Sequence, residues 1–155
     1  MVSLSGLWLS NGCCLYCFSK ADSIVTSKLL VKLQTYGITG QLLAWISLFL
    51  TNRTQRVVID YCLSSECDVI SGVPQGTVLG PILFLIYIND VEHVCCGDTK
   101  LQLFADDVKL YSNVSIYDAS RSLHQSLDNL VAWANEWQLA VNISKCAVVS
   151  LSSKP

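Results

Sequence analysis

Two adjacent aspartates, Asp106 and Asp107, interrupt a strand-like stretch that runs from Leu101 to Tyr111. Apolar residues recur at alternate positions on both sides of the pair, a pattern typical of strands with one buried face. These apolar positions are Leu101, Leu103, Val108 and Leu110. The pattern predicts a tight hairpin, with the Ala105-Asp106-Asp107 segment at the bend and both aspartates in a two-residue turn between strands 101–105 and 108–112.

Segments with helical and strand-like patterns alternate along the rest of the chain. Between Ser27 and Leu50 apolar residues recur at helical spacing, and the interruption at residues 36–40 predicts two helices, the first ending near Gly37. The other predicted elements are a strand at 16–21, a turn at 51–53, a β-rich segment at 56–61, a hairpin connection at 62–66, a strand at 67–70, a helix from Gly80-Pro81 to about Val91, an amphipathic helix at 118–137 and a strand at 146–151. This mixture predicts an α+β fold, a sheet covered on one face by helices. Residues 1–15 have weak periodicity and are interpreted as a poorly defined lead-in.

Composition excludes several classes of protein. The 155 residues suffice for one ordinary domain, and 52% hydrophobic against 14% charged residues excludes a disordered chain. The formal charge of −2 gives no basic surface for binding nucleic acid, so other segments would have to supply the charge that holds phosphates. Although the mean hydropathy is +0.45, the longest nearly apolar run, Val78–Ile88, contains Gly80 and Pro81 and falls short of the ~20 residues of a membrane helix. We therefore expect no membrane contact.

Eight cysteines raise the question of disulfides or a metal site. The N-terminus lacks Lys or Arg before its apolar stretch, so it does not support a secretory signal and the disulfides that would follow. Cys14 and Cys17 form a CxxC pair, and Cys95 and Cys96 lie close to His93. The wide separation of the two groups favours free thiols over a zinc site, and a Cys-based zinc or redox protein remains an alternative.

A turn-rich loop, Ser71-Gly72-Val73-Pro74-Gln75-Gly76, precedes the predicted helix at Gly80-Pro81. Because Gly72 and Gly76 lack side chains, the backbone of this loop can approach a base or a sugar closely. The alternative is an ordinary strand-to-helix connection. The Asp106-Asp107 pair also has two interpretations, since aspartates are common in turns and clustered carboxylates are the ligands that Mg²⁺ prefers. A pair alone cannot hold two ions, so a metal site would need a further carboxylate from a neighbouring strand.

The loop from Ser71 to Pro81, followed by Phe104-Ala105-Asp106-Asp107, resembles the palm of reverse transcriptases. The most similar class is that of non-LTR, LINE-type, jockey-like retrotransposons. Four further stretches agree with that class in order and spacing, namely Phe18-Ser19-Lys20-Ala21, the segment from Lys28 to Ile38, the segment from Phe49 to Val58, and the segment from Trp137 to Cys146. The resemblance covers roughly residues 16–152 and implies a partial palm domain over 16–155, a small antiparallel sheet with helices packed on one face.

The resemblance also implies a reaction, RNA-templated DNA synthesis by nucleotidyl transfer with two Mg²⁺ ions, or Mn²⁺. It assigns metal binding to Asp106 and Asp107, and contact with template and incoming nucleotide to Gly72, Pro74, Gln75 and Gly76. Lys145 matches a lysine proposed to give a proton to pyrophosphate, although it could also be a solvated lysine before a strand. The implied partners are an RNA template, a DNA primer and a dNTP.

The sequence departs from the family pattern at its first strand. Cys17 stands where the first catalytic aspartate is expected, and the aromatic residue expected between Ala21 and Asp22 is missing. Cysteine is a soft ligand and a poor substitute for an anionic oxygen around Mg²⁺. We expect Cys17 to lie on the strand beside the aspartate hairpin, with its Cβ facing the Asp106 carboxylate, and the chain alone to be inactive.

The resemblance leaves two alternative functions open and has one further consequence. A shifted Asp22 could retain weak nucleotidyl transfer together with the hairpin aspartates. Alternatively, the chain could be a non-catalytic RNA- or protein-interaction module derived from a polymerase palm. We also expect the fingers and thumb of the family to be absent from this sequence, which would leave apolar patches and strand edges uncovered and the isolated chain prone to self-association.

Overall fold

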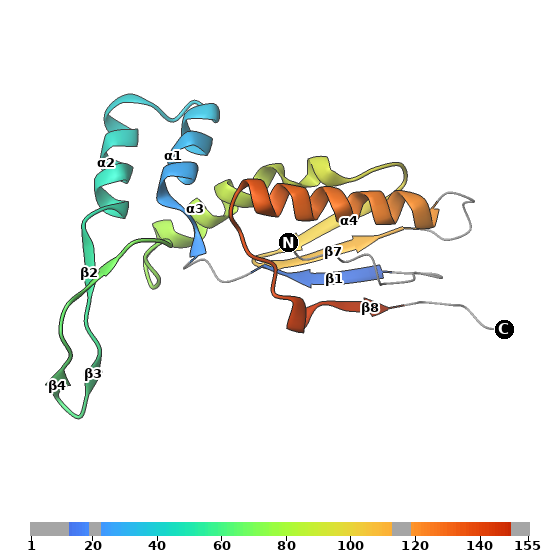
Figure 1. Cartoon of the computed structure of the whole chain (residues 1–155). Coiled ribbons are helices and arrows are strands. Elements are labelled where there is room, and N and C mark those ends of the chain that lie inside the picture. The colour runs from blue at the N-terminus through green and yellow to red at the C-terminus, as the bar shows by residue number, and fades with distance from the viewer. Residues whose placement is uncertain (1–12, 19–22, 113–118, 150–155) are drawn as a thin grey trace. The chain divides into compact units, whose positions relative to one another are not determined.

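The computed structural model describes residues 13–18, 23–112 and 119–149, arranged as helices and strands (Figure 1). In chain order these are β1 (Cys13–Cys17), α1 (Thr26–Thr35), α2 (Gly40–Leu50), β2 (Arg53–Gln55), β3 (Val58–Ile59), β4 (Cys62–Leu63), β5 (Cys67–Val69), α3 (Leu79–Ile88), the 3₁₀ helix η2 (Asn89–Val94), β6 (Lys100–Phe104), β7 (Asp107–Tyr111), α4 (Ala119–Glu136), the 3₁₀ helix η3 (Ile143–Lys145) and β8 (Ala147–Val149). The chain forms two compact units, which we name the sheet unit (Met1–Lys20 with Asn89–Pro155) and the helical unit (Ala21–Ile88).

The sheet unit contains a four-stranded antiparallel sheet in the order β6-β7-β1-β8. In β7 the side chains of Val108 and Leu110 are buried and that of Lys109 is exposed, as expected for a strand with one covered face. Helix α4 lies along one face of this sheet (Figure 1). Its buried residues recur at helical spacing, at Leu123, Leu127, Leu130 and Ala134. The predicted α+β fold, a small antiparallel sheet covered on one face by a helix, is confirmed.

Polar contacts fasten the segment after η2 to α4. The buried Ser126 hydroxyl accepts a hydrogen bond from the Cys96 backbone N–H at 2.8 Å and donates to the Ser122 carbonyl at 2.7 Å. The Asn129 amide donates to the Val94 carbonyl at 3.1 Å. These bonds join the backbone at Val94 and Cys96 to side chains of α4.

In the helical unit, α1 and α2 form the predicted pair of helices. The backbone turns between them at Gly37, whose φ of +83° lies in the left-handed region that glycine adopts readily. The core of this unit is built from apolar residues of α1, α2 and α3, which are Leu29, Leu33, Ile46, Leu50, Leu83, Phe84, Tyr87 and Ile88. The buried Lys32 ammonium donates a hydrogen bond to the Tyr87 carbonyl and lies 5.0 Å from the centroid of the Tyr87 ring, linking α1 to the last turn of α3.

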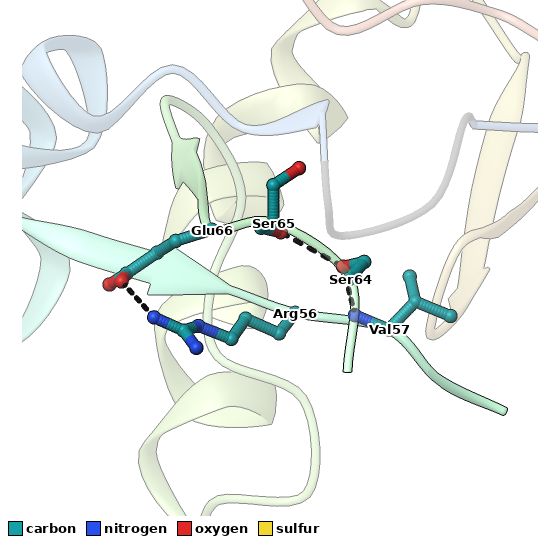
Figure 2. A network of polar contacts seen from close by, with 5 residues as sticks. All are labelled: Arg56, Val57, Ser64, Ser65 and Glu66. Atoms are coloured by element: carbon teal, nitrogen blue, oxygen red, sulfur yellow. Dashed lines mark hydrogen bonds and ion pairs between the residues drawn. The ribbon is translucent and has the colours of Figure 1, made fainter. Parts of the chain in front are cut away.

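The strands of the helical unit form one two-stranded ribbon made of two short antiparallel pairs, β2 with β5 and β3 with β4. The turn lies at Asp60-Tyr61, with φ values of +47° and +65°. The predicted connection at 62–66 was therefore wrong, because Cys62 and Leu63 pair with β3. Farther from the turn, Arg56 and Glu66 form an exposed ion pair at 2.6 Å, and the Ser64 hydroxyl accepts from the Val57 N–H and donates to the Ser65 carbonyl (Figure 2).

Two element boundaries differ clearly from the predictions. Strand β1 begins at Cys13 instead of Tyr16, because residues 13–15 pair with both β7 and β8. Residues 19–21 of the predicted first strand lie outside the described residues. The helix that contains Pro81 ends at Ile88 and continues as 3₁₀ turns to Val94. Among the residues that the structure describes, no helix is both long and apolar enough to cross a membrane.

Candidate functional site

The aspartate pair lies at the hairpin between β6 and β7. The two turn residues are Ala105 and Asp106, and Ala105 has a φ of +51°. Asp107 is the first residue of β7 and pairs with Phe104. The hairpin was predicted correctly, but its bend was placed one residue too late, because cross-strand pairing takes Asp107 into the ladder. Asp106 is half-buried and Asp107 is exposed.

Strand β1 runs beside this hairpin and ends at its tip. Cys17 is the register partner of Asp107, and the next backbone N–H, that of Phe18, donates to the Asp106 carbonyl at 2.8 Å. The expectation that Cys17 lies on the strand beside the hairpin is confirmed by this register. The direction of its side chain, and the whole of Asp22, lie outside what the structure describes.

Phe18 holds the end of β1 in place. Its side chain is buried, its ring centroid lies 5.7 Å from that of Trp133 on α4, and its backbone forms a β-bridge with Val141. Sequence reasoning used Phe18 only as part of a motif and gave it no role. Through these contacts the backbone at the end of β1 is tied to the hairpin on one side and to the core on the other.

Lys145 ends the 3₁₀ helix η3, immediately before β8, and its side chain is exposed. Its backbone N–H donates to the Asn142 carbonyl at 3.0 Å, which closes the turn. Since β8 pairs with β1, Lys145 belongs to the same unit as the aspartate hairpin.

The glycine-rich loop belongs to the helical unit. Gly72 and Gly76 have φ values of +80° and +74°, a conformation that glycine adopts without strain. The Gly72 N–H donates to the Ile24 carbonyl at 2.7 Å. Of the predicted contact residues, Gly72 is buried and Pro74 is half-buried, whereas Gln75 and Gly76 are exposed. The exposed tip of the loop is thus formed by two residues that the sequence had singled out.

The end of the loop packs against the first turn of α3. The Thr77 hydroxyl donates to the Pro74 carbonyl at 2.7 Å and accepts from the Gly80 N–H at 3.1 Å. A Cβ atom on Gly80 would lie 2.6 Å from the Pro74 oxygen, so this position has room only for glycine. These contacts join the loop firmly to the helix that follows it.

Arg53 contacts the start of the loop, and sequence reasoning assigned it no role. Its guanidinium donates to the carbonyls of Leu50, Ser71 and Gly72. The only signal in the sequence was an arginine directly after a helix, where its donors can reach the last carbonyls. The contact with residues 71 and 72 joins positions too far apart in sequence to be foreseen.

Comparison with known proteins identifies the family. The sequence model described as "Reverse transcriptase (RNA-dependent DNA polymerase)" matches residues 17–154. The chain belongs to the reverse transcriptase family. It is 35% identical over 121 residues to the RNA-directed DNA polymerase from the mobile element jockey of Drosophila melanogaster, and 32% identical over 123 residues to that of Drosophila funebris. It is also 33% identical over 110 residues to a probable RNA-directed DNA polymerase from the transposon X-element of Drosophila melanogaster.

These relatives are much longer than this reverse transcriptase chain. The match to the Drosophila melanogaster jockey polymerase covers 74% of this chain and 13% of that protein. The match to the Drosophila funebris polymerase covers 75% of this chain and 13% of that protein, and the match to the X-element polymerase covers 68% of this chain and 12% of that protein. Among solved structures, telomerase from Candida albicans has a similar fold, with a TM-score of 0.51 and 15% identity over 95% of this chain and 28% of that one. The jockey-like retrotransposon resemblance and the fold that it implied are both confirmed.

The residues that the structure describes do not supply the ligands of a pair of Mg²⁺ ions. The hairpin offers two carboxylates, and the register neighbour of Asp107 is Cys17, whose thiol is a soft donor. Two such ions carry four positive charges. The family pattern places three aspartates around them, whereas the matching positions here hold two aspartates and Cys17. Within residues 13–18, 23–112 and 119–149, no three side chains of His, Cys, Asp or Glu are grouped as a metal site.

Proposed function

We propose that this chain is a palm segment of an RNA-directed DNA polymerase that does not transfer nucleotides by itself. Membership of the reverse transcriptase family supports the descent of the chain, and RNA template and nucleotides are what that family binds. The proposal of inactivity depends on one observation, the backbone register that places Cys17 beside Asp107 at the tip of the hairpin. The position that matches the first catalytic aspartate therefore carries no carboxylate.

Each remaining residue of the proposed site keeps a role that its own chemistry allows. Asp106 and Asp107 would supply anionic oxygens at the hairpin. The exposed Gln75 and Gly76, anchored through Gly72 and Pro74, would contact template and nucleotide. Lys145 has an exposed ammonium that can donate a proton to, and stabilise, a leaving pyrophosphate. The bound divalent metal would supply Lewis acidity, but the donor set described above does not fit it, so no step is assigned to it.

The experiment that tests this proposal begins with the purified chain. Primer extension on a primed RNA template, with Mg²⁺ and separately with Mn²⁺, should give no detectable product. The chain is then grafted as the palm of a complete related polymerase, which positions primer and template. Four forms of the graft are compared, which are the unchanged chain, Cys17→Asp, an aromatic residue inserted after Ala21, and both changes together.

The expected result is activity only in the form that carries both changes. Losing a metal ligand and the geometry that it enforces removes several kcal/mol of transition-state stabilisation, and each ~1.4 kcal/mol is about tenfold in rate. Activity of the graft with Cys17 unchanged would refute the lost-ligand explanation, and would favour residual transfer that recruits Asp22.

A non-catalytic protein-interaction module is the second candidate function. The ribbon formed by the four strands from β2 to β5 favours it. Its apolar side chains are exposed at Val57, Val58, Ile59, Tyr61, Leu63 and Ile70. Residues 53–69 contain Arg53 and Arg56 against Asp60, Glu66 and Asp68, a balance that does not suit binding to phosphates. If this module is the function, the graft should stay inactive even with both changes, although it folds.

A further inference from the structure

We propose that Arg53 is a positioning residue, which holds the Ser71–Gly76 loop in the conformation that meets template and nucleotide. The proposal rests on the proposed function, because that function gives the loop its ligands. No part of the sequence pattern assigns Arg53 to the site.

The contacts of the Arg53 guanidinium join two backbone segments of the helical unit. Nε donates to the Leu50 carbonyl at 2.9 Å, at the end of α2. Nη2 donates to the Ser71 carbonyl at 3.1 Å and to the Gly72 carbonyl at 2.5 Å, at the start of the loop. The side chain is half-buried, and hydrogen bonds from a charged donor to carbonyls are stronger than neutral ones. Arg53 therefore ties the start of the loop to the end of a helix.

The loop is anchored at both ends and exposed at its tip. At its start, Gly72 is held through its carbonyl by Arg53 and through its N–H by the Ile24 carbonyl. At its end, Thr77 bonds both the Pro74 carbonyl and the Gly80 N–H. Because the exposed Gln75 and Gly76 lie between these anchors, they are ordered before any ligand arrives. Ordering in advance lowers the entropic cost of binding.

The geometry calls for a guanidinium specifically. Arginine presents several donors in a rigid planar fork, so one side chain can reach carbonyls on two sides, whereas the ammonium of lysine is a single point of donation. Arg56 provides the matched control. It follows β2 in the same ribbon and carries the same guanidinium, but it forms the exposed ion pair with Glu66, away from the loop (Figure 2).

The first test measures amide hydrogen exchange in the full chain for wild type, Arg53→Gln, Arg53→Lys and Arg56→Gln. Removing the guanidinium should speed exchange at loop residues 73 and 75–78 by about tenfold or more, since it removes charge-assisted bonds. Arg53→Lys should give an intermediate rate and Arg56→Gln a change within about twofold. Exchange in the middle of α1 and α2, and in α4, should stay unchanged.

The second test uses the graft with Cys17→Asp and the inserted aromatic residue. Adding Arg53→Gln should raise the KM for dNTP by about tenfold with a smaller effect on kcat, because a disordered loop weakens nucleotide binding before chemistry. Arg56→Gln should leave both constants within about twofold.

The outcomes separate this inference from the proposed function. Equal acceleration of exchange throughout the helical unit, full restoration by lysine, or no change in the loop would each overturn the role of Arg53. Loop-selective exchange with unchanged KM would also overturn it, because the loop would then not serve the reaction. A graft that never becomes active contradicts the proposed function, and the exchange data then decide whether Arg53 holds the loop.

Discussion

Gly80 occupies a position at which a single added methyl group meets backbone. A Cβ there would lie 2.6 Å from the Pro74 oxygen and 3.2 Å from the Thr77 hydroxyl oxygen. Both oxygens belong to the Thr77–Pro74 hydrogen bond, so neither can move away from an added Cβ without breaking it. The loop conformation therefore depends on glycine at this residue.

We predict that Gly80→Ala lowers the free energy of unfolding by about 1–3 kcal/mol, the usual cost of overpacking. The gain in helix propensity from alanine, about 1 kcal/mol, is smaller than the cost of the clash. The measurement is chemical denaturation followed by circular dichroism. Val78→Ala, at a strongly exposed neighbouring position, is the control and should stay within about 0.5 kcal/mol of wild type.

The Cys95 thiol is harder to deprotonate than an ordinary thiol. Burial raises the pKa of Cys95, and the neighbouring Cys96 and Glu92 raise it further. Cys62 and Cys67 are exposed. Because the thiolate is the reacting form, a raised pKa slows alkylation at neutral pH.

Iodoacetamide at pH 7.5 should therefore modify Cys62 and Cys67 well before Cys95, as followed by mass spectrometry of peptides. The rate at Cys95 should keep rising with pH above the ordinary pKa of a thiol, since its folded-state pKa is raised. Folding stability should fall in that same alkaline range, because the unfolded chain releases the Cys95 proton first. Equal rates at all three residues would contradict this ordering.

At the scale of residues, the sequence predicted where a residue lies better than which other residues it contacts. The motif match placed Cys17 next to the aspartate hairpin, and the strand register agrees. The roles of Arg53 and Phe18 were not predictable, because both act through contacts with residues distant in sequence, Ser71 and Gly72 for one and Trp133 for the other.

At the scale of elements, the β3–β4 hairpin shows where local sequence and conformation disagree. Its two turn residues, Asp60 and Tyr61, both have positive φ, as in the type I′ turns that favour Asn-Gly. Tyr61 is fully exposed, at 102% of its reference area. Its ring therefore makes no packing contacts that would offset the strain of its positive φ. The β-rich stretch before it favoured a longer strand, and the absence of a glycine concealed the turn.

Replacing Tyr61 by glycine should stabilise this hairpin by about 1 kcal/mol, because glycine adopts positive φ at little cost. Tyr61→Ala is the matched control, since it removes the ring but keeps a Cβ at the strained position. Amide exchange at Val58–Leu63 provides the measurement. Slower exchange in the glycine variant alone supports the backbone explanation, whereas equal slowing in both variants would assign the effect to the ring.

The long helices and the aspartate hairpin were predictable because their patterns are local. Periodic apolar residues define α1, α2 and α4, and strict alternation defines β7. Boundaries set by pairing were not predictable. The start of β1 at Cys13 and the entry of Asp107 into β7 both depend on partner strands that come from distant parts of the sequence.

For the whole molecule, the exposed apolar surface is the property with the clearest consequence. Strongly exposed apolar side chains lie on α2, on the ribbon, in the segment between β5 and α3, and on the aspartate hairpin. They include Leu48, Ile59, Tyr61, Ile70, Val78 and Phe104. Both edges of the β3–β4 pair lack a further strand among the residues that the structure describes. Exposed apolar patches and open strand edges promote association.

We predict that the isolated chain self-associates, and that light scattering at about 50 μM gives a mass above that of a monomer, within the concentration range in which exposed apolar surface drives association. A double variant, Val58→Thr with Leu63→Thr, tests whether the ribbon is responsible. The two residues are cross-strand partners, and threonine is a residue that strands accept well. Its hydroxyl makes the exposed surface of the ribbon less apolar. The matched control, Leu48→Thr, changes an equally exposed residue on α2. If the ribbon mediates association, the double variant should shift the mass towards 17.0 kDa and the control should not. A monodisperse wild-type monomer at that concentration would contradict the prediction, and an equal shift in both variants would assign association to exposed apolar surface in general instead of to the ribbon.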